Sequence, residues 1–254
     1  IALEDVTEAF GYGFKQSVKE KGCRASQVNH CLTWLNRLLY IAVDKGLLRF
    51  NPTADVPYEK KDAPQLRHIS RSQLMYIMEH PMTNKWQELV RRTFIFSAFT
   101  ALSYVDVQEL YPRHIGRTAD GRRYIRILRK KTGVESFIPL HPVAEQILDL
   151  YNTEDDTKPV FPMPNRDMIW YAIHEIGVLA GVKGSLSYHQ SRHTFGTLMM
   201  SAGIPIESIS KMMGHTNIRT TQTYAKVTDD KISEDMDRLM QVRKANGLTK
   251  NDDR

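Results

Sequence analysis

The sequence predicts an α+β fold that is mainly helical and carries one small antiparallel sheet. Across much of the chain, apolar side chains recur every three or four positions, which is typical of amphipathic helices. One region differs: the strings RYIRIL at 123–128 and VESFIPL at 134–140 read as strands, separated by a turn at 131–133. A polar segment with two prolines, 57–66, indicates a boundary between two domains.

The first predicted domain covers residues 1–62 and is helical. We expect one helix over 3–21 and a second over 26–46, where Ser26 can cap the start and Gly46 can end the helix. Because the chain begins with Ile1 and not with Met, we expect it to be part of a longer protein and this domain to be incomplete at its N-terminus.

The second predicted domain covers residues 63–228. It opens at Ser70 and Gln73, which form a capping-box pair ahead of a helix. Residues 229–254 are expected to form an amphipathic helix at 230–242 and a disordered tail at 246–254. The other helices expected in this domain lie at 86–101, 142–151, 166–180, 188–202, 205–213 and 219–226.

The basic charge of the chain is concentrated in the second domain. The 254 residues contain 35 Lys and Arg against 29 Asp and Glu, a formal net charge of +6. Residues 113–131 contain eight basic side chains and one acid, Asp120, which favours a phosphate-facing surface over a merely solvated hairpin only if other features agree. The candidate phosphate contacts are Arg113, Arg117, Arg122, Arg123, Arg126 and Lys130.

Cysteine content and hydropathy restrict the setting of the protein. Two cysteines, Cys23 and Cys31, cannot form a framework of several disulfides, which favours a reducing cytoplasm. No apolar run reaches the roughly 18 to 20 residues that a membrane span needs, so we expect no membrane partner.

Four motifs in the second domain together suggest phosphoryl transfer without a metal. They contain Lys131 in the turn, His189 and Arg192 one helical turn apart, His215 after a glycine, and Tyr224. A phosphodiester needs fixed cations on its oxygens, which Arg192 can provide through two parallel hydrogen bonds. A tyrosine titrates near pH 10 and needs a neighbouring base or cation in order to attack, and a lysine among other cations can protonate a leaving alkoxide.

Each of these residues also has an ordinary structural interpretation. A single His-x-x-Arg pair is usually structural, a single tyrosine usually packs in a core, and a lysine in a turn is usually solvated. His193, four residues after His189, opens a zinc alternative, but no Glu completes a His-Glu-x-x-His motif and no third ligand is evident. We therefore expect no metal and no cofactor.

The ordered set of motifs resembles the tyrosine recombinases, the phage integrase family of site-specific DNA recombinases. The resemblance extends over about 68–240 and, less specifically, over 1–56, and it implies a recombinase catalytic fold preceded by a helical core-binding domain. The matching strings are KTG at 131–133 with IPL at 138–140, HQSRHTF at 189–195, MMGH at 212–215 and TTQTYA at 220–225.

The resemblance implies a role for each motif residue. Tyr224 would attack the scissile phosphate and form a 3′-phosphotyrosine, while Arg192 and His215 hold the phosphate oxygens. His189 would exchange a proton with the nucleophile, and Lys131 would protonate the leaving 5′-oxygen.

The family also implies partners and a biological setting. The expected partners are double-stranded DNA at specific recombination sites, three further copies of the chain in a tetramer on that DNA, and a host DNA-bending factor. Residues 229–254 would contact a neighbouring protomer through the helix at 230–242, with packing of this helix on its own chain as an equal alternative. The expected location is the bacterial cytoplasm, at the nucleoid when the protein is bound, and the expected outcome is integration or excision of a mobile genetic element.

The chain departs from the family pattern at one position. The family has an arginine followed three residues later by an acid, but the string TALSYVD at 100–106 has Ser103 in place of the arginine and Asp106 as the acid. Either catalysis is impaired or another cation takes over the role. Our candidate is Arg129, which shares a strand face with Lys131, and Arg126 is the fallback. A serine at this position resembles integrases of conjugative elements from Bacteroides-type bacteria.

Three alternatives to an active integrase follow from the same residues. A DNA-binding relative without catalysis would bind DNA in a salt-dependent manner and form no covalent adduct. A type IB topoisomerase would share the chemistry and act as a monomer. A zinc protein is the last alternative, and metal analysis of the purified chain would identify it.

Overall fold

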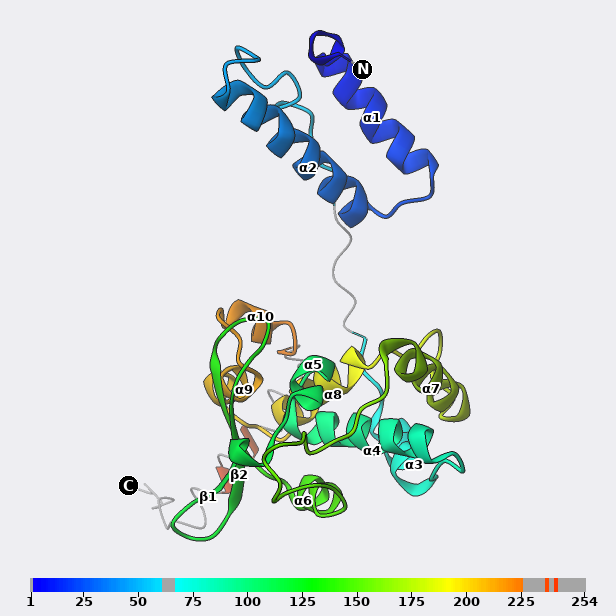
Figure 1. Ribbon diagram of the computed structural model, residues 1–254, viewed down its shortest axis with the longest axis vertical. Coiled ribbons are helices and arrows are strands. Elements are labelled where there is room, and N and C mark those ends of the chain that lie inside the picture. Colours follow the sequence, from blue (N-terminus) through cyan, green and yellow to red (C-terminus); the bar gives the residue numbers. More distant parts are fainter. Residues whose placement is uncertain (1, 61–66, 226–235, 238–239, 242–254) are drawn as a thin grey trace, which may run out of the picture. The chain divides into compact units, whose positions relative to one another are not determined.

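The computed structural model describes residues 2–60, 67–225, 236–237 and 240–241. The chain divides between residues 65 and 66 into two compact units, inside the polar segment 57–66 (Figure 1). Most of the predicted helix at 230–242 lies outside the described residues.

The first unit contains a short 3-10 turn and two helices. The turn, η1, covers Leu3–Asp5, and the helices are α1 (Glu8–Glu20) and α2 (Ala25–Asp44). The prediction of one helix over 3–21 is wrong because Thr7 adopts an extended conformation and caps α1, accepting a hydrogen bond from the Phe10 amide at 3.2 Å. Ser26 is not a cap either, since α2 begins at Ala25 with Arg24 as its N-cap residue.

A small core joins α1 and α2 to the segment after α2. Val28 and Leu32 of α2 pack with Val56, and Gly11 of α1 lies so close to this segment that a Cβ would meet Val56 Cγ2 at 2.7 Å. The close approach of α1 therefore depends on this glycine. Gly46 ends α2 as predicted, with a positive φ of 70°.

The second unit confirms a mainly helical fold with a small antiparallel sheet. Residues 104–108, 112–114 and 115–117 form short elements that the sequence did not predict, and the helix predicted at 219–226 ends at Gln222. The elements are α3 (Arg71–Glu79), α4 (Lys85–Thr100), α5 (Tyr104–Gln108), η2 (Pro112–His114), β1 (Ile115–Arg117), β2 (Arg123–Leu128), β3 (Glu135–Pro139), α6 (Pro142–Leu148), α7 (Arg166–Leu179), α8 (His189–Ser201), α9 (Ile206–Met213) and α10 (Arg219–Gln222).

The three strands form one antiparallel sheet in the order β1-β2-β3. Ile125 at the centre of β2 pairs with Ile115 of β1 and Ile138 of β3. Ile125, Ile127 and Ile138 are buried while Arg126 and Leu128 are exposed, so the alternation of β2 directs one face to the core. The turn between β2 and β3 carries the chain toward α9 (Figure 1).

Helix α4 is the centre of the second unit. It packs against α3, α6, α7 and α8, and Phe94 and Phe96 on it are fully buried (Figure 1). Burial of a phenylalanine contributes roughly 1.5 to 3 kcal/mol relative to its exposure. The C-terminus of α4 is therefore a firmly anchored point, and the candidate site is built on it.

Both cysteines are free thiols. Of the helices that the structure describes, none is long and apolar enough to cross a membrane.

Candidate active site

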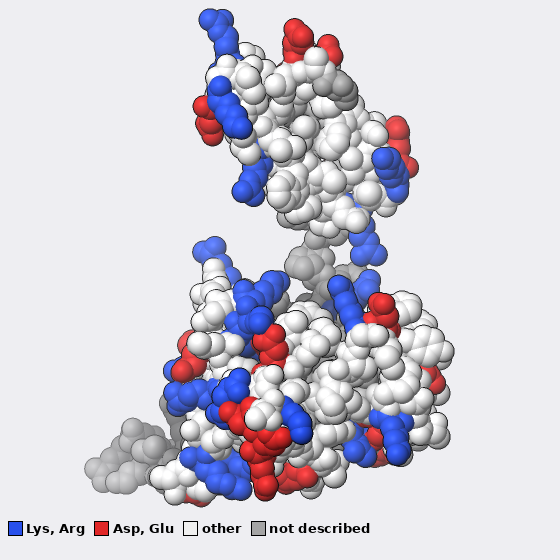
Figure 2. Space-filling view, in the orientation of Figure 1, with Lys and Arg blue, Asp and Glu red and all other residues white. Residues whose placement is uncertain are grey.

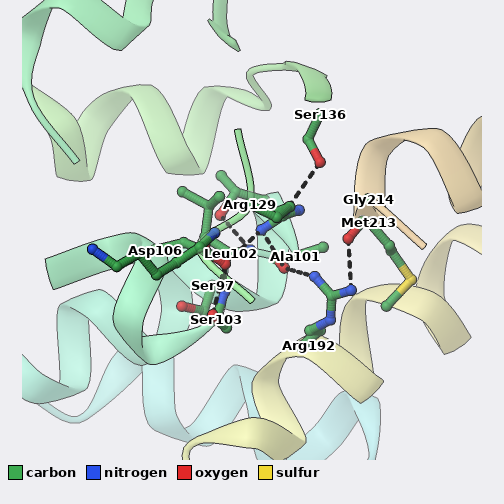
Figure 3. Close-up of polar contacts among 12 residues, drawn as sticks. Ser97, Ala101, Leu102, Ser103, Asp106, Arg129, Ser136, Arg192, Met213 and Gly214 are labelled. Carbon is green, nitrogen blue, oxygen red and sulfur yellow. Dashed lines mark hydrogen bonds and ion pairs between the residues drawn. The ribbon is translucent and has the colours of Figure 1, made fainter. Parts of the chain in front are cut away.

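Two arginines from distant parts of the chain converge on one carbonyl. Arg129, just after β2, and Arg192 of α8 both donate to the Ala101 oxygen, at 3.2 and 2.7 Å (Figure 3). Arg129 also donates to the Met212 oxygen at 2.7 Å, and Arg192 to the Met213 oxygen at 2.6 Å. The two guanidinium groups are thus held side by side between the ends of α4 and α9.

The carbonyls that hold the arginines lie at helix C-termini. The last carbonyls of a helix lack intrahelical partners and carry partial negative charge, which attracts cations. Ala101 ends α4 with a φ of +58°, the only positive φ among the described residues other than glycines. This left-handed turn brings the Ala101 carbonyl within reach of both guanidinium groups.

Gly214 makes room for Arg129. Its φ is +65°, and a Cβ there would lie 2.5 Å from both Arg129 Cγ and Ser136 Oγ. Both the backbone conformation and the space therefore require glycine. Ser136 of β3 in turn accepts a hydrogen bond from Arg129 Nε at 2.7 Å. The glycine in the string MMGH is therefore needed because the Arg129 side chain packs directly against it.

Ser103 has a structural role in this arrangement. Its hydroxyl donates to Asp106 Oδ2 at 2.6 Å, and its backbone amide donates to the same oxygen at 3.1 Å, so Asp106 closes the first turn of α5. Asp106 also forms a buried ion pair with Arg129 at 3.1 Å and accepts the Lys130 amide. Burial favours a higher pKa for Asp106, but the Ser103 hydrogen bond and Arg129 outweigh it and lower the pKa.

The paired guanidinium groups favour an anion between them. Burial, followed by the charge of Arg192, lowers the pKa of Arg129 to about 10, and burial also lowers the pKa of Arg192. Both side chains therefore remain charged at pH 7. An anion shared by the two would offset their repulsion through charge-assisted hydrogen bonds.

Lys131 and His189 lie close to each other, and His189 lies close to Arg192. Lys131 is exposed on the β2–β3 turn, which Thr132 joins to the end of α9 through a hydrogen bond to the Gly214 carbonyl at 3.3 Å. Burial first, then the charges of Arg192 and Lys131, lower the pKa of His189. His189 at the start of α8 is therefore neutral at pH 7 and close to both cations.

His215 is oriented by the segment that carries Tyr224. Its Nδ1 lies 2.8 Å from the Thr221 hydroxyl of α10, which leaves Nε2 for another partner. Burial, followed by the charges of Arg192 and Arg129, lowers the pKa of His215 to about 4. The neutral imidazole can donate to an oxygen at this position when Thr221 donates to its Nδ1.

Tyr224 lies buried against α8. Its hydroxyl is 2.9 Å from Nδ1 of His193, and its ring packs with Phe195, Met213 and Ala101. Burial raises the pKa of Tyr224, and the nearby charge of Arg192 opposes this effect. The structure therefore brings Tyr224, Arg192 and Arg129 into one site of a single chain.

His193 is the site residue that the sequence did not single out for a role with Tyr224. It was considered only as a zinc ligand beside His189, and the two rings do lie with centroids 4.6 Å apart. Across the part of the chain that is described, no group of three His, Cys, Asp or Glu side chains could hold a metal ion. The only feature of the sequence that could have pointed to a role for His193 at Tyr224 was its position immediately after Arg192.

The predicted DNA contacts do not form one uncompensated basic surface. Most of them pair with acids, several of which lie outside 113–131. Blue and red side chains accordingly adjoin one another on the face of the second unit seen in Figure 2. The pairs are Arg113–Asp156 at 3.3 Å, Arg122–Asp120 at 2.9 Å, Arg126–Glu135 at 3.3 Å, Lys130–Glu109 at 2.8 Å, and Arg123–Asp149; Arg117 donates to the Gly121 carbonyl. The pairs of Arg113, Arg122, Arg126 and Lys130 are exposed and break readily, so these cations can still meet phosphates at the cost of about 0 to 1 kcal/mol each. The Arg123 side chain is only 12% exposed.

The two histidines with strongly lowered pKa predict that acid destabilises the fold. His193 and His215 have pKa values of about 4 in the native chain, against an ordinary value of 6.5. Between these values the unfolded chain binds more protons, so stability is fully present above pH 6.5 and falls toward pH 4. The expected slope is about 1.4 kcal/mol per pH unit for each histidine.

Urea unfolding between pH 7.5 and 4.5 measures this slope. His193→Asn and His215→Asn should each flatten the dependence, whereas His174→Asn, an exposed residue on α7, should leave it as in the parent. Equal slopes in all four proteins would contradict the assignment of these two half-buried imidazoles as neutral in the native chain.

Known proteins share this fold. The tyrosine recombinase XerC of Haemophilus influenzae (strain PittEE) is 24% identical over 230 residues, covering 87% of this chain and 75% of the relative. A structure of the Tn1549 transposon integrase with circular intermediate DNA covers 93% of this chain and 86% of that one, with a TM-score of 0.68 and 18% identity. A lambda integrase dimer bound to a core site covers 90% and 84%, with a TM-score of 0.69 and 16% identity.

The fold and these relatives define the class of protein as a tyrosine-type site-specific recombinase. The model of the phage integrase family matches residues 69–231, well over half of the chain. The chain therefore belongs to the phage integrase family.

Proposed function

We propose that this chain is a DNA integrase whose own arginine, Arg129, replaces the arginine missing at Ser103. The observation that carries the proposal is the convergence of Arg129 and Arg192 on the Ala101 carbonyl, at 3.2 and 2.7 Å. Two adjacent guanidinium groups beside a tyrosine suit the transition state of phosphodiester cleavage, in which charge spreads over the non-bridging oxygens.

The proposed reaction conserves the phosphodiester bond energy. Tyr224 Oη forms a bond to phosphorus and loses its proton, while the bond from phosphorus to the 5′-oxygen breaks. Lys131 protonates that oxygen, and His189 exchanges the tyrosyl proton. The phosphate is held by both arginines and by His215. In the reverse direction a 5′-hydroxyl attacks the phosphotyrosine, so no ATP is consumed.

The proposed partner is double-stranded DNA at specific recombination sites. The Tn1549 and lambda integrases have been solved with DNA, and their likeness to this chain extends over nearly its whole length. We further propose that four copies assemble on the DNA with the help of a host DNA-bending factor, that residues 229–254 contact a neighbouring copy, and that the first unit is a core-binding domain.

The missing arginine also supports a narrower assignment. The pairing of Ser103 with Asp106 and of Asp106 with Arg129 forms one connected network, so the serine belongs to an alternative design of the site and not to a damaged one. We propose a mobile element of the Bacteroides conjugative type, with the protein acting in a bacterial cytoplasm at the nucleoid.

Replacing Lys131 tests the proposed mechanism directly. Lys131→Ala should slow single-turnover cleavage about 10² to 10³-fold, because the 5′-oxygen then leaves as an unprotonated alkoxide. A substrate with sulfur in place of the bridging 5′-oxygen needs no such proton, so it should be cleaved by the variant at nearly the parent rate. The substrate is a duplex carrying the joined ends of the element that encodes the chain.

Lys130→Ala is the matched control. Lys130 directly precedes Lys131 and pairs with Glu109 on the surface. The Lys130→Ala variant should therefore cleave the oxygen substrate at a rate within about threefold of the parent rate. If Lys131→Ala remained equally slow on the sulfur substrate, Lys131 would not be the acid.

A further inference from the structure

His193 and Gly196 are two residues of α8 that the proposed reaction does not use, and both face Tyr224. His193 Nδ1 is 2.9 Å from the Tyr224 hydroxyl. Gly196 lies three residues further along the helix, where a Cβ would sit 2.8 Å from three carbons of the tyrosine ring. One turn of α8 therefore contacts both the hydroxyl and the ring of the expected nucleophile.

We propose that His193 is a positioning residue that, together with Gly196, holds Tyr224 in the site of its own chain before DNA binds. This inference rests on the proposed role of Tyr224 as the nucleophile. The hydrogen bond fixes the hydroxyl end, and the absence of a Cβ at Gly196 lets the ring lie directly on the helix. We call this hydrogen bond from Tyr224 to His193, together with the close contact of its ring with Gly196, the seat of Tyr224. Without this seat, the tyrosine would be held by the apolar cluster that includes Phe195, Ile209 and Met213.

Position, and not proton removal, is the function that fits the chemistry of the pair. Burial first, then the charges of His189 and Arg192, lower the pKa of His193 to about 4, while burial raises that of Tyr224 above its ordinary value. An imidazole so weak as a base accepts a hydrogen bond from the phenol but does not ionise it. Before DNA binds, Tyr224 is therefore a neutral phenol beside Arg192.

The order of residues on α8 gives this seat a further consequence. Arg192 and His193 are consecutive, so one side chain reaches the carbonyls that hold the phosphate-binding arginines while the next reaches the nucleophile. Any movement of α8 shifts both together. The seat thus keeps the distance between the nucleophile and the phosphate site nearly constant.

Tyrosine labelled with ¹³C at Cζ reports on the seat without any DNA. The Tyr224 resonance is identified by its loss in Tyr224→Phe. His193→Phe removes the acceptor and should shift or broaden this resonance, whereas His193→Asn keeps an acceptor oxygen near the place of Nδ1 and should preserve it. Gly196→Leu, which fills the space beneath the ring, should also displace the signal; Gly13→Leu on α1, where a Cβ meets nothing within 4 Å, is its control.

Single-turnover cleavage then separates positioning from proton transfer. We expect His193→Phe to slow cleavage at least tenfold with unchanged affinity for DNA, and His193→Asn to restore most of the rate. A rate as low in His193→Asn as in His193→Phe would overturn the proposal, because the imidazole would then be needed for its proton chemistry. An unchanged Tyr224 resonance in both His193→Phe and Gly196→Leu would overturn it as well.

The two measurements also distinguish this inference from the proposed function. The resonance is measured on the chain alone, so a seat that holds Tyr224 is detected or refuted whether or not the parent forms an adduct with DNA. Failure of the parent to form an adduct would refute the proposed function, whereas a normal Tyr224 resonance in the seat variants would refute only the seat.

Discussion

Tyr224→Phe is expected to abolish the covalent protein–DNA adduct. A phenylalanine has no oxygen to attack phosphorus, so the loss should be complete within detection, at least 10⁴-fold. The adduct is measured by denaturing gel electrophoresis after incubation with a duplex that carries a nick next to the cleavage position, which traps the intermediate. The fold should survive, since the change removes one hydrogen bond, to His193, worth about 1 kcal/mol.

Two further measurements make this result specific. Tyr171→Phe alters an exposed tyrosine on α7 and should form the adduct as the parent does. Tyr224→Phe should bind DNA with the parent's affinity, and this affinity should fall with salt in both proteins. An adduct that persists in Tyr224→Phe would place the nucleophile elsewhere. A parent without any adduct would instead favour a DNA-binding relative that has lost catalysis.

Local rules were enough to predict most of the elements of this fold. The strand at 123–128 and the capping box at Ser70 and Gln73 are found where the sequence indicates them. The short elements at 104–117 were missed because their few residues carry no periodicity; they form because Asp106 closes α5 and β1 finds a partner in β2.

The site was harder to predict because its key contacts cross long stretches of sequence. The sequence pointed to Arg129 from its two-residue spacing to Lys131, but the reason it is held lies 28 residues earlier, at the Ala101 carbonyl. The hydrogen bond between Tyr224 and His193 joins residues 31 positions apart, and no periodic pattern in the sequence indicates it. Likewise, the charge of 113–131 could not be interpreted from that stretch alone, because Glu109, Glu135 and Asp149 neutralise part of it.

Arg129→Lys is expected to lower single-turnover cleavage about 10² to 10³-fold, which is the usual effect of removing one donor to a developing oxyanion. Lysine keeps a positive charge beside Asp106, so the fold should be largely retained, but an ammonium group cannot donate in parallel to Ser136, Ala101, Met212 and a phosphate. Arg126→Ala, which removes an exposed arginine from the same hairpin, is the control and should cleave within about threefold of the parent.

Arg129→Ala adds a stability effect that must be measured separately. It leaves Asp106 buried at 3% exposure without its ion pair, which costs about 3 to 5 kcal/mol. Urea unfolding should therefore show a large loss for Arg129→Ala and a small one for Arg129→Lys. Because cleavage is compared at a temperature where both proteins are folded, a low rate in Arg129→Lys reports on the phosphate site and not on unfolding.

A second substitution can separate the position of the arginine from its charge. If Arg129 performs the task that the family assigns to the position of Ser103, then Ser103→Arg should return part of the lost activity to Arg129→Ala. Arg126→Ala should respond to the same change with no gain. A parent rate in Arg129→Lys, or a failure of Ser103→Arg to help a folded Arg129→Ala, would mean that the cation comes from elsewhere. Rescue would show that one guanidinium at this helix end serves the phosphate, whichever strand or loop supplies it.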